Sequence, residues 1–232
     1  MGSGFCPVHA SKSINTGPCY IPGVLLLLLA ADTADRVAIA ASGEVEAFLI
    51  DRSEVSIQDF EAFAGQGGYG QARLWSEEGL AWLAENPGGQ GAPHRRADRN
   101  PEHPVVAVTF YEAEAYCAWR GGRLPTEEQW SLAVCGPESP RWPAEEANWY
   151  GGSKYGQVHS VATVVEGPPQ GPNQLQNGSG NVWEWTTSGL GEQWKVLKGG
   201  SYANLPSYCT CSHREAREPS VAAYTTGFRC VY

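Results

Sequence analysis

The sequence is poor in basic residues and contains no long hydrophobic run. Its 16 Lys and Arg residues are outnumbered by 25 Asp and Glu residues, which gives a formal net charge of −9 at pH 7. A nucleic-acid backbone is bound by clustered positive charge, so this composition excludes nucleic acid as the main partner. The apolar run Val24–Ala31 covers eight residues, whereas a membrane-spanning helix needs about 20. The sequence therefore predicts no membrane span.

The same apolar run is interpreted as a buried strand over residues 24–29. A signal peptide is the alternative, but its apolar part would lie behind a polar, turn-forming segment that contains Pro18 and Pro22. Lys12 is the only basic residue in that segment, whereas signal peptides begin with a positively charged region. A cytoplasmic location is therefore favoured, and the compartment stays open.

Several sequence patterns that carry known chemistry are also missing. No pair among the seven cysteines has the spacing of a zinc finger, and Cys209-Thr-Cys211 is too short for half of such a site. The five histidines are scattered along the chain. The chain has no Gly-rich phosphate loop, no Ser-His-Asp order and no paired-carboxylate constellation. These absences argue against the corresponding enzyme classes.

Glycine, proline and tryptophan are what the sequence has in abundance. Its 232 residues include 28 Gly, 16 Pro and 9 Trp, which indicates one large domain that is rich in turns and loops. Long loops need aromatic anchors because they bury little surface by themselves. Most of the tryptophans are therefore interpreted as core anchors.

Helical periodicity and capping signals predict four helices. Ser56, Thr109 and Thr126 are each expected to cap a helix, with an Asp, Glu or Gln three residues later as the partner. A short amphipathic helix is expected inside an insertion. The predicted segments are Ser56–Ala64, Trp75–Ala84, Thr109–Trp119 and Thr126–Val134.

The predicted strands are few and short. Residues 65–104 read as a long excursion from the core, and residues 137–181 as loops. Strands are expected at 24–29, 45–50, 105–108, 159–164 and 194–198. This pattern predicts an irregular α+β domain with a small antiparallel sheet, helices and long ordered loops.

Five short segments in fixed order resemble a known family. They are Pro104–Thr109, Gly122–Trp130, Gly180-Asn-Val-Trp-Glu-Trp185, Lys198-Gly-Gly-Ser-Tyr202 and Gly227-Phe-Arg229. Together they resemble the sulfatase-modifying domain of formylglycine-generating enzymes, which has a C-type-lectin-like fold. The resemblance covers residues 18–232 and leaves 1–17 as an N-terminal segment.

The resemblance implies a test for catalysis. The enzymes of this family hold Cu(I) with two cysteine thiolates that follow the Gly-Gly-Ser-Tyr segment, and soft thiolates suit that ion. Here the matching positions are Asn204 and Cys209, while Ser201 keeps the serine of the motif. Because Asn is a poor Cu(I) ligand, the resemblance predicts that this chain has no catalytic residues and is not an enzyme. A copper oxygenase with altered chemistry is the alternative.

The family also implies disulfides and a calcium loop. Its structural disulfides match Cys117–Cys230 and Cys135–Cys211, each worth about 4 kcal/mol in the loop-entropy model. A further pair, Cys6–Cys19, has no support from the family. The calcium loop matches Asn177, Gly180, Val182 and Glu184, whose oxygen atoms suit that ion. Calcium is therefore a possible cofactor, and Glu184 is alternatively a buried partner for Arg229 or Arg123. Iron-dependent sulfoxide synthases share this domain, but their His-rich helical motif is missing here.

Variable proteins of diversity-generating retroelements also end in this domain. Their mutable segment runs from Gly-Gly-Ser to Gly-Phe-Arg, which corresponds here to residues 199–229. Mutagenesis at template adenines gives codons for Tyr, Ser, Asn and Ala but not for Lys, Gln, Met or Trp, and residues 202–226 contain none of those four types. Glu215 and Glu218 lie outside this alphabet and are expected to be fixed.

The resemblance thus implies a non-catalytic ligand-binding protein with a hypervariable surface. Tyr side chains among small polar residues are typical of a binding surface. An unknown protein or surface ligand is the expected partner, and a structural lectin-like module is a third alternative. The expected display positions are Tyr202, Ala203, Asn204, Leu205, Ser207, Tyr208, His213 and Tyr224.

Overall fold

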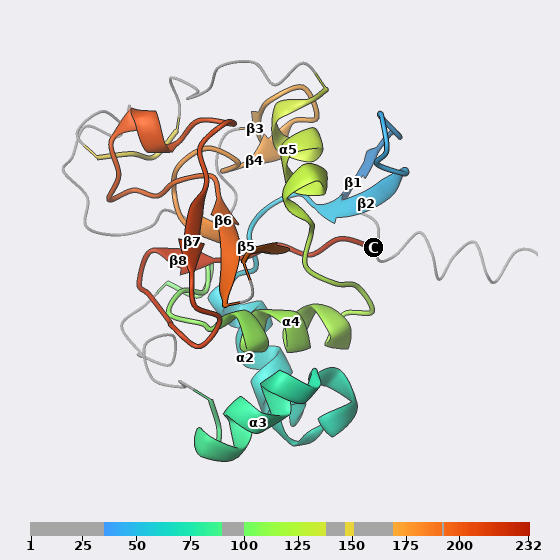
Figure 1. Cartoon of the computed structure of the whole chain (residues 1–232), viewed down its shortest axis with the longest axis vertical. Helices are drawn as coiled ribbons and strands as arrows, with labels where there is room; N and C mark the ends of the chain where they lie inside the picture. Colours follow the sequence, from blue (N-terminus) through green and yellow to red (C-terminus); the bar gives the residue numbers. More distant parts are fainter. Residues whose placement is uncertain (1–34, 90–99, 138–146, 151–168, 192) are drawn as a thin grey trace, which may run out of the picture. The chain divides into compact units, whose positions relative to one another are not determined.

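A computed structural model describes residues 35–89, 100–137, 147–150, 169–191 and 193–232 (Figure 1). The described part is a mixed α+β unit of short helices and strands connected by long loops. In chain order its elements are β1 (Arg36–Ile39), β2 (Phe48–Asp51), α2 (Ile57–Gly65), the 3-10 turns η1 (Gly68–Gly70) and η2 (Ala72–Leu74), α3 (Glu77–Glu85), α4 (Phe110–Trp119), α5 (Glu127–Cys135), β3 (Pro169–Gln170), β4 (Leu175–Gln176), β5 (Trp183–Leu190), β6 (Trp194–Lys198), η3 (Pro206–Tyr208), β7 (Glu215–Arg217) and β8 (Thr226–Gly227).

The central sheet has the strand order β7-β6-β5-β8. Strand β6 pairs antiparallel with both β5 and β7, and the short β8 runs parallel to β5. The β5–β6 register shifts between Trp185 and Gly189. Two small antiparallel ladders, β1–β2 and β3–β4, flank this sheet. The C-terminal part of the chain therefore supplies the sheet itself, and β6 leads directly into the loop that carries the expected display positions.

The three predicted helix caps are confirmed, and the helix expected from Trp75 begins at Glu77. Thr109 and Thr126 each form a capping box, in which the Thr hydroxyl accepts from the third helical residue and that residue's side chain accepts from the Thr backbone. Ser56 caps α2 by accepting from the backbone of Asp59, and Ser76 caps α3 in the same way through Gly79. Local sequence is sufficient for these helices because each cap lies within four residues of its partner.

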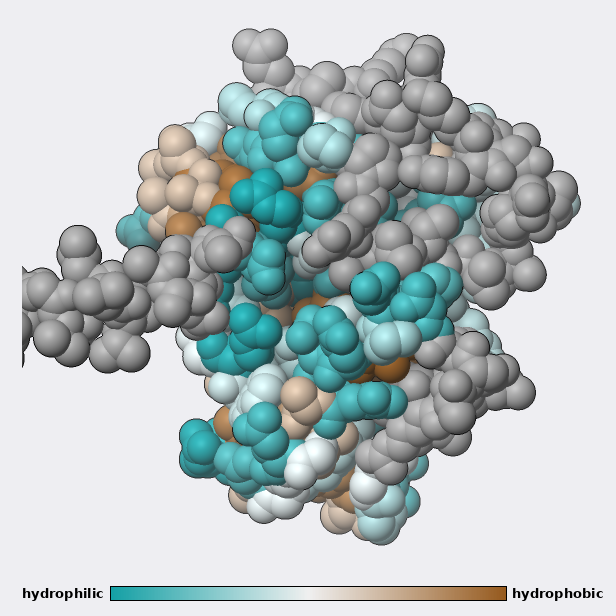
Figure 2. Space-filling view, turned by 180° about the vertical axis from the view of Figure 1, so that it is seen from behind, coloured by the Kyte–Doolittle hydropathy of each residue, from teal (hydrophilic) through white to brown (hydrophobic). Residues whose placement is uncertain are grey.

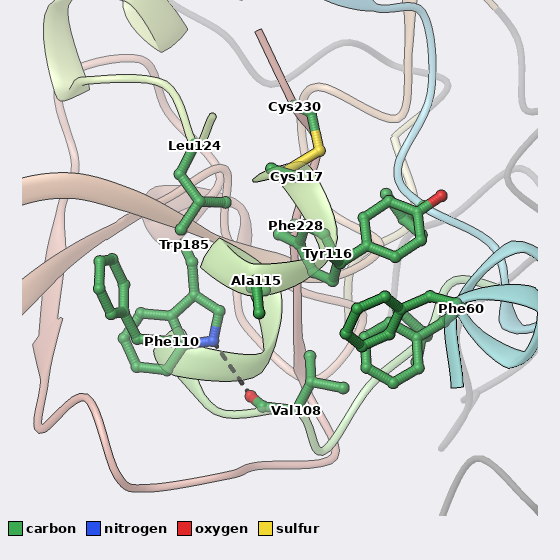
Figure 3. Close-up of a cluster of buried hydrophobic side chains, with 14 of the residues drawn as sticks. Phe60, Val108, Phe110, Ala115, Tyr116, Cys117, Leu124, Trp185, Phe228 and Cys230 are labelled. Atoms are coloured by element: carbon green, nitrogen blue, oxygen red, sulfur yellow. Dashed lines mark hydrogen bonds between the residues drawn. A yellow bond between two sulfur atoms is a disulfide. The ribbon is translucent and has the colours of Figure 1, made fainter. Parts of the chain in front are cut away.

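The main core lies between helices α2 and α4 and one side of the sheet. Tyr116 of α4 stacks on Phe60 of α2 with ring centroids 5.7 Å apart, and it meets the edge of Phe228 at 5.4 Å. Trp185 of β5 donates its indole N–H to the carbonyl of Val108 at 3.1 Å (Figure 3). These aromatic side chains are fully enclosed and join the helices to the sheet.

The two disulfides expected from the family are present. Cys117–Cys230 ties α4 to the C-terminal segment, as Figure 3 shows. Cys135–Cys211 ties the last turn of α5 to the loop after η3. Their cysteines are 113 and 76 residues apart in the sequence. The other expected pair, Cys6–Cys19, lies outside the described residues.

Two expectations about the middle of the chain were wrong. Residues 105–108 are buried but form no strand, because the N–H of Val105 donates to Val55 while that of Ala107 donates to Ala223. Ala107 also has a φ of 57°, which interrupts an extended backbone. The segment 65–104 was expected to be an excursion from the core, but in its described part, residues 65–89, Trp75 and Trp82 are buried in the main cluster.

The remaining strand predictions have mixed outcomes. The strand at 194–198 is β6, and the strand expected at 45–50 is β2, which begins at Phe48. The strands expected at 24–29 and 159–164 lie outside the described residues, as does the boundary expected between residues 17 and 18.

Among the described residues, no helix is long and apolar enough to cross a membrane. On the face turned away from the viewer in Figure 1, hydrophilic side chains cover much of the coloured surface, and the apolar patches are small (Figure 2).

Candidate ligand-binding site

The loop that follows β6 begins with a tight turn. Gly199 and Gly200 both have positive φ values, 96° and 77°. At Gly200 a Cβ atom would lie 2.5 Å from the sulfur of Cys209, so only glycine fits there. Ser201 then donates its hydroxyl to the side-chain oxygen of Asn204 at 2.5 Å, and Asn204 donates its backbone N–H to the carbonyl of Ser201 at 2.9 Å. The two glycines and this turn fix where the next side chains point.

Most of the expected display positions are at the surface. Leu205 is 55% exposed and Tyr224 is 57% exposed, and Ala203, Ser207 and Tyr208 are exposed as well. Asn204 and His213 are half-buried. The ring of His213 meets that of Tyr208 at 4.8 Å in a T-shaped contact, which holds both rings in place. The loop therefore presents apolar and small polar side chains from a backbone with defined internal contacts.

Tyr202 is an exception among the expected display positions. Its side chain is 8% exposed and packs with Val106 and Val182 in a small buried cluster. Its hydroxyl lies 3.5 Å from the carbonyl of Tyr224, to which it donates. The expected display role of Tyr202 is therefore corrected, because the ring supports the surface from below and joins its two segments.

The position of the family's thiolate pair holds a single enclosed thiol. Cys209 is free and buried, and its sulfur lies 3.9 Å from the carbonyl oxygens of Ser201 and Leu205. Burial raises the pKa of the Cys209 thiol to about 12, so the group stays protonated at neutral pH. The other position holds Asn204, whose side chain is part of the turn. One thiol and one amide do not supply the pair of sulfur ligands that the family uses for Cu(I).

The structure brings a residue that sequence reasoning missed to this surface. Tyr150 is 50% exposed, and its backbone N–H donates to the carbonyl of Asn204 at 2.9 Å. The preceding residue pair is anchored, since Asn148 is buried and forms a bridge with Gly180. Tyr150 is more than 50 residues from Asn204 in the sequence, and nothing in the local sequence indicates their contact.

A second missed residue is Glu54, which is linked to the same loop through Asn181, because the carbonyl of Asn181 accepts from the backbone of Tyr202. It sits between β2 and α2, is buried, and accepts the side-chain amides of Asn177 at 3.0 Å and Asn181 at 2.9 Å. Burial raises the pKa of its carboxyl, and the positive charge of Arg229 opposes that shift. The sequence shows Glu54 only as an acidic residue just before a helix.

The residues matched to the calcium loop are placed together, but their geometry favours an ion pair. Both carboxylate oxygens of Glu184 accept from Arg229, at 2.7 Å each, and one also accepts from the indole of Trp130 at 2.8 Å. Asn177 donates its amide to Glu54. Within the described residues, no group of three or more His, Cys, Asp or Glu side chains is arranged to hold a metal.

The other two members of the calcium set, Gly180 and Val182, were expected to offer backbone carbonyls. Gly180 has a φ of 79°, and a Cβ atom there would lie 2.2 Å from the carbonyl oxygen of Asn148, so the backbones approach closely at this point. The side chain of Val182 is buried under Tyr202. This set does not fit calcium well, because its only carboxylate already neutralises a guanidinium. The structure supports the alternative interpretation, in which Glu184 is the buried partner of Arg229.

Comparison with known proteins gives one family. The model of the sulfatase-modifying factor enzyme 1-like domain matches residues 14–232. The chain is 31% identical to the inactive C-alpha-formylglycine-generating enzyme 2 of Mus musculus over 262 aligned residues, which cover 91% of this chain and 84% of that protein.

Two further proteins resemble the chain, one in sequence and one in fold. The chain is 31% identical to hercynine oxygenase of Mycobacterium tuberculosis, with 82% of this chain and 53% of that protein covered, so it spans about half of that relative. The structure of Treponema denticola variable protein 1 superposes with a TM-score of 0.60 and 18% identity, covering 85% of this chain and 91% of that one. At this identity the likeness concerns the fold alone.

Proposed function

Because the chain belongs to the sulfatase-modifying factor enzyme 1-like domain family, we propose that it is a non-catalytic protein that binds a ligand through the loop surface after β6. The fold is C-type-lectin-like, and the proteins that resemble this chain include both a variable protein and an oxygenase. The choice between these two functions therefore depends on the site and not on the fold.

The observation that carries the proposal is what occupies the two positions at which the family holds its copper-binding thiolates. Asn204 is part of a turn with Ser201, and the thiol of Cys209 is enclosed beneath it with a pKa near 12. The oxygenase chemistry of the family needs two thiolates, and the two matching positions here hold one cysteine and one asparagine. The related protein from mouse is named as inactive, which agrees with this proposal.

The ligand is proposed to be a protein or another macromolecular surface. The five exposed display positions, Ala203, Leu205, Ser207, Tyr208 and Tyr224, carry no charged side chain. Large rigid aromatic side chains supply contact area at low entropic cost, while small polar residues adapt to the partner. A surface of this kind suits a protein partner better than it suits phosphate groups.

The finer proposal is that a retroelement diversifies residues 199–229. The test is to sequence the DNA that flanks the gene and to search for a reverse transcriptase and a near-copy of the DNA that encodes this segment. A copy that differs only at template adenines supports the proposal and identifies the display positions. A locus without either feature contradicts it.

The competing function is a copper or thiol oxygenase, which is favoured by the oxygenase among the relatives and by the retained Cys209. We expect the native chain to consume no oxygen with Cu(I) and a Cys-containing peptide. Asn204→Cys, which supplies the second thiol, is the matched comparison and is expected to bind Cu(I) where the native chain does not. Copper-dependent peptide oxidation by the native chain, lost in Cys209→Ser, would overturn the non-catalytic proposal.

A further inference from the structure

Three backbone hydrogen bonds, together with the chain segments 148–150 and 202–204, form a closed ring of backbone contacts at the ligand-binding surface. Tyr202 donates its N–H to the carbonyl of Asn181 at 2.9 Å, and Asn181 donates its own N–H to Asn148 at 2.8 Å. Tyr150 then donates to Asn204 at 2.9 Å. The ring of Asn181, Asn148, Tyr150, Asn204 and Tyr202 therefore joins the loop after β6 to the separate segment that carries Tyr150. Asn181 is bonded to both parts, because its carbonyl accepts from Tyr202 in the loop and its N–H donates to Asn148 in the other segment.

Asn181 adopts a backbone conformation that its side chain must hold. Its φ of 60° lies in the left-handed region, which residues other than glycine enter rarely, Asn being among the most frequent. Its side-chain oxygen accepts from Asn148 at 3.3 Å, and its side-chain nitrogen donates to Glu54 at 2.9 Å. The side chain is thus used at both ends, once as an acceptor and once as a donor.

Glu54 is the group that fixes this orientation. Its two oxygens accept from two different amides, those of Asn177 and Asn181, which both have positive φ values. Only an acceptor at both oxygens satisfies two amide donors. A glutamine would place an NH₂ group against one of them, and a buried donor would then lose its partner. Glu54 is 127 residues from Asn181 in the sequence and is itself buried.

We propose that Glu54 is a positioning residue for the ligand-binding surface, acting through Asn181 on both the loop after β6 and the segment of Tyr150. The inference rests on the proposed function, because that function is what makes this surface a binding surface. The hydrogen bonds from which it is argued are independent of the proposed function. Residues of the display loop can change while Glu54, Asn181 and the backbone ring keep the same geometry. Such a separation of anchor and display is what a diversified binding surface requires.

The test compares Glu54→Gln with the double variant Glu54→Gln/Asn181→Asp. In the double variant the polarity of one hydrogen bond is reversed, because the new amide at position 54 donates to the new carboxylate at position 181. That carboxylate still accepts from Asn148, and the amide oxygen at position 54 still accepts from Asn177. An aspartate also tolerates the left-handed backbone region. The full chain is used, and amide hydrogen exchange is measured by NMR without any ligand.

In Glu54→Gln, we expect the amides of Tyr202 and Tyr150 to exchange at least ten-fold faster relative to those of the β5–β6 ladder, which corresponds to about 1.4 kcal/mol. The double variant is expected to restore their protection. Glu112→Gln is the matched control, because Glu112 is also buried and accepts from Thr109 and Tyr69 at the start of α4. It is expected to leave the ratio of ring exchange to ladder exchange unchanged.

Three outcomes would overturn the proposal: no selective change in Glu54→Gln, no recovery in the double variant, or the same selective change in Glu112→Gln. If Glu54→Gln does not fold, the double variant decides alone, since recovery of the fold with protected Tyr202 and Tyr150 amides supports the proposal and failure to fold contradicts it. A locus without a template copy would reject the retroelement proposal and leave this result standing, so the two failures are distinguishable.

Discussion

Arg229 and Glu184 form a fully enclosed ion pair at the centre of the C-terminal half. The guanidinium donates Nε and Nη2 to the two carboxylate oxygens at 2.7 Å each, and both side chains are inaccessible to solvent. Arg229 also donates to the backbone carbonyls of Arg52 and Gln176 at 2.9 Å. The pair therefore connects β5 and the C-terminal segment with the end of β4 and with Arg52, which follows β2.

Removal of one charge from this pair is expected to be costly. We expect Glu184→Gln to lower the free energy of unfolding by about 3–5 kcal/mol, because it leaves a buried guanidinium without its counter-charge. The exposed pair of Arg214 with Glu127 is the control, and Arg214→Gln is expected to cost at most about 1 kcal/mol. Urea unfolding measures both. Equal losses in the two variants would show that the enclosed pair has no special role.

The same pair leads to a prediction about calcium. Since Glu184 already neutralises Arg229, we expect the Tm to be the same with millimolar Ca²⁺ and with a chelator. Binding to the folded state alone would raise stability in proportion to the logarithm of the ion concentration. A Tm that rises with Ca²⁺, and does so less in Asn177→Ala, would contradict this expectation and establish the calcium loop that the family resemblance implies.

The sequence predicted the features of this protein that depend on neighbouring residues. The capping boxes at Thr109 and Thr126 are local, so the starts of α4 and α5 could be located without a structure. The motif order was sufficient for the family and both disulfides. Glu54 and Tyr150 could not be found, because their partners are distant in the sequence and nothing in their own surroundings indicates them.

Burial was the other limit of the sequence. Tyr202 and Tyr224 lie in the same polar segment and look equivalent in the sequence. In the structure, however, Tyr202 is buried and Tyr224 is exposed. The run at 105–108 has the hydrophobicity of a strand, but its hydrogen bonds go to two separate loops. Such features follow from tertiary packing, which overrides local preference.

The two disulfides are expected to stabilise the chain similarly but to affect different regions. In the loop-entropy model, removing either one costs about 4–5 kcal/mol, because both close long loops. We expect the paired alanine variants of Cys117–Cys230 and of Cys135–Cys211 to show comparable losses in urea unfolding. Only the second is expected to increase amide exchange near Cys209, since Cys211 lies two residues further on. Selective loosening of that loop by the first variant would contradict this assignment.

Tyr202 and Tyr224 allow a comparison of a buried supporting ring with an exposed display position. We expect Tyr202→Ala to lower the free energy of unfolding by about 3 kcal/mol or more, as for other large buried aromatic residues. Tyr224→Ala is expected to change it by less than about 0.5 kcal/mol, because its ring is mostly in solvent. Thermal unfolding of both variants measures the difference. A large loss in Tyr224→Ala would show that its ring is a structural element and not a display position.

Cys209 gives a prediction about reactivity and pH. Burial raises the pKa of its thiol to about 12, whereas an unfolded cysteine titrates near 8.5, so at pH 8 the native thiol is almost entirely protonated. We expect iodoacetamide to modify Cys209 at least a hundred-fold more slowly in the native chain than in denaturant, as followed by mass spectrometry.

The same thiol gives a prediction about stability and pH. The Cys209 thiol ionises first in the unfolded chain as the pH rises, so Cys209 is expected to lower stability progressively between about pH 8.5 and 12 and to have no such effect below that range. The variant Cys209→Ser, which does not titrate in this window, is the control for the pH dependence. Rapid alkylation of Cys209 in the native chain at pH 8 would show that the thiol is accessible and would contradict the enclosed position described here.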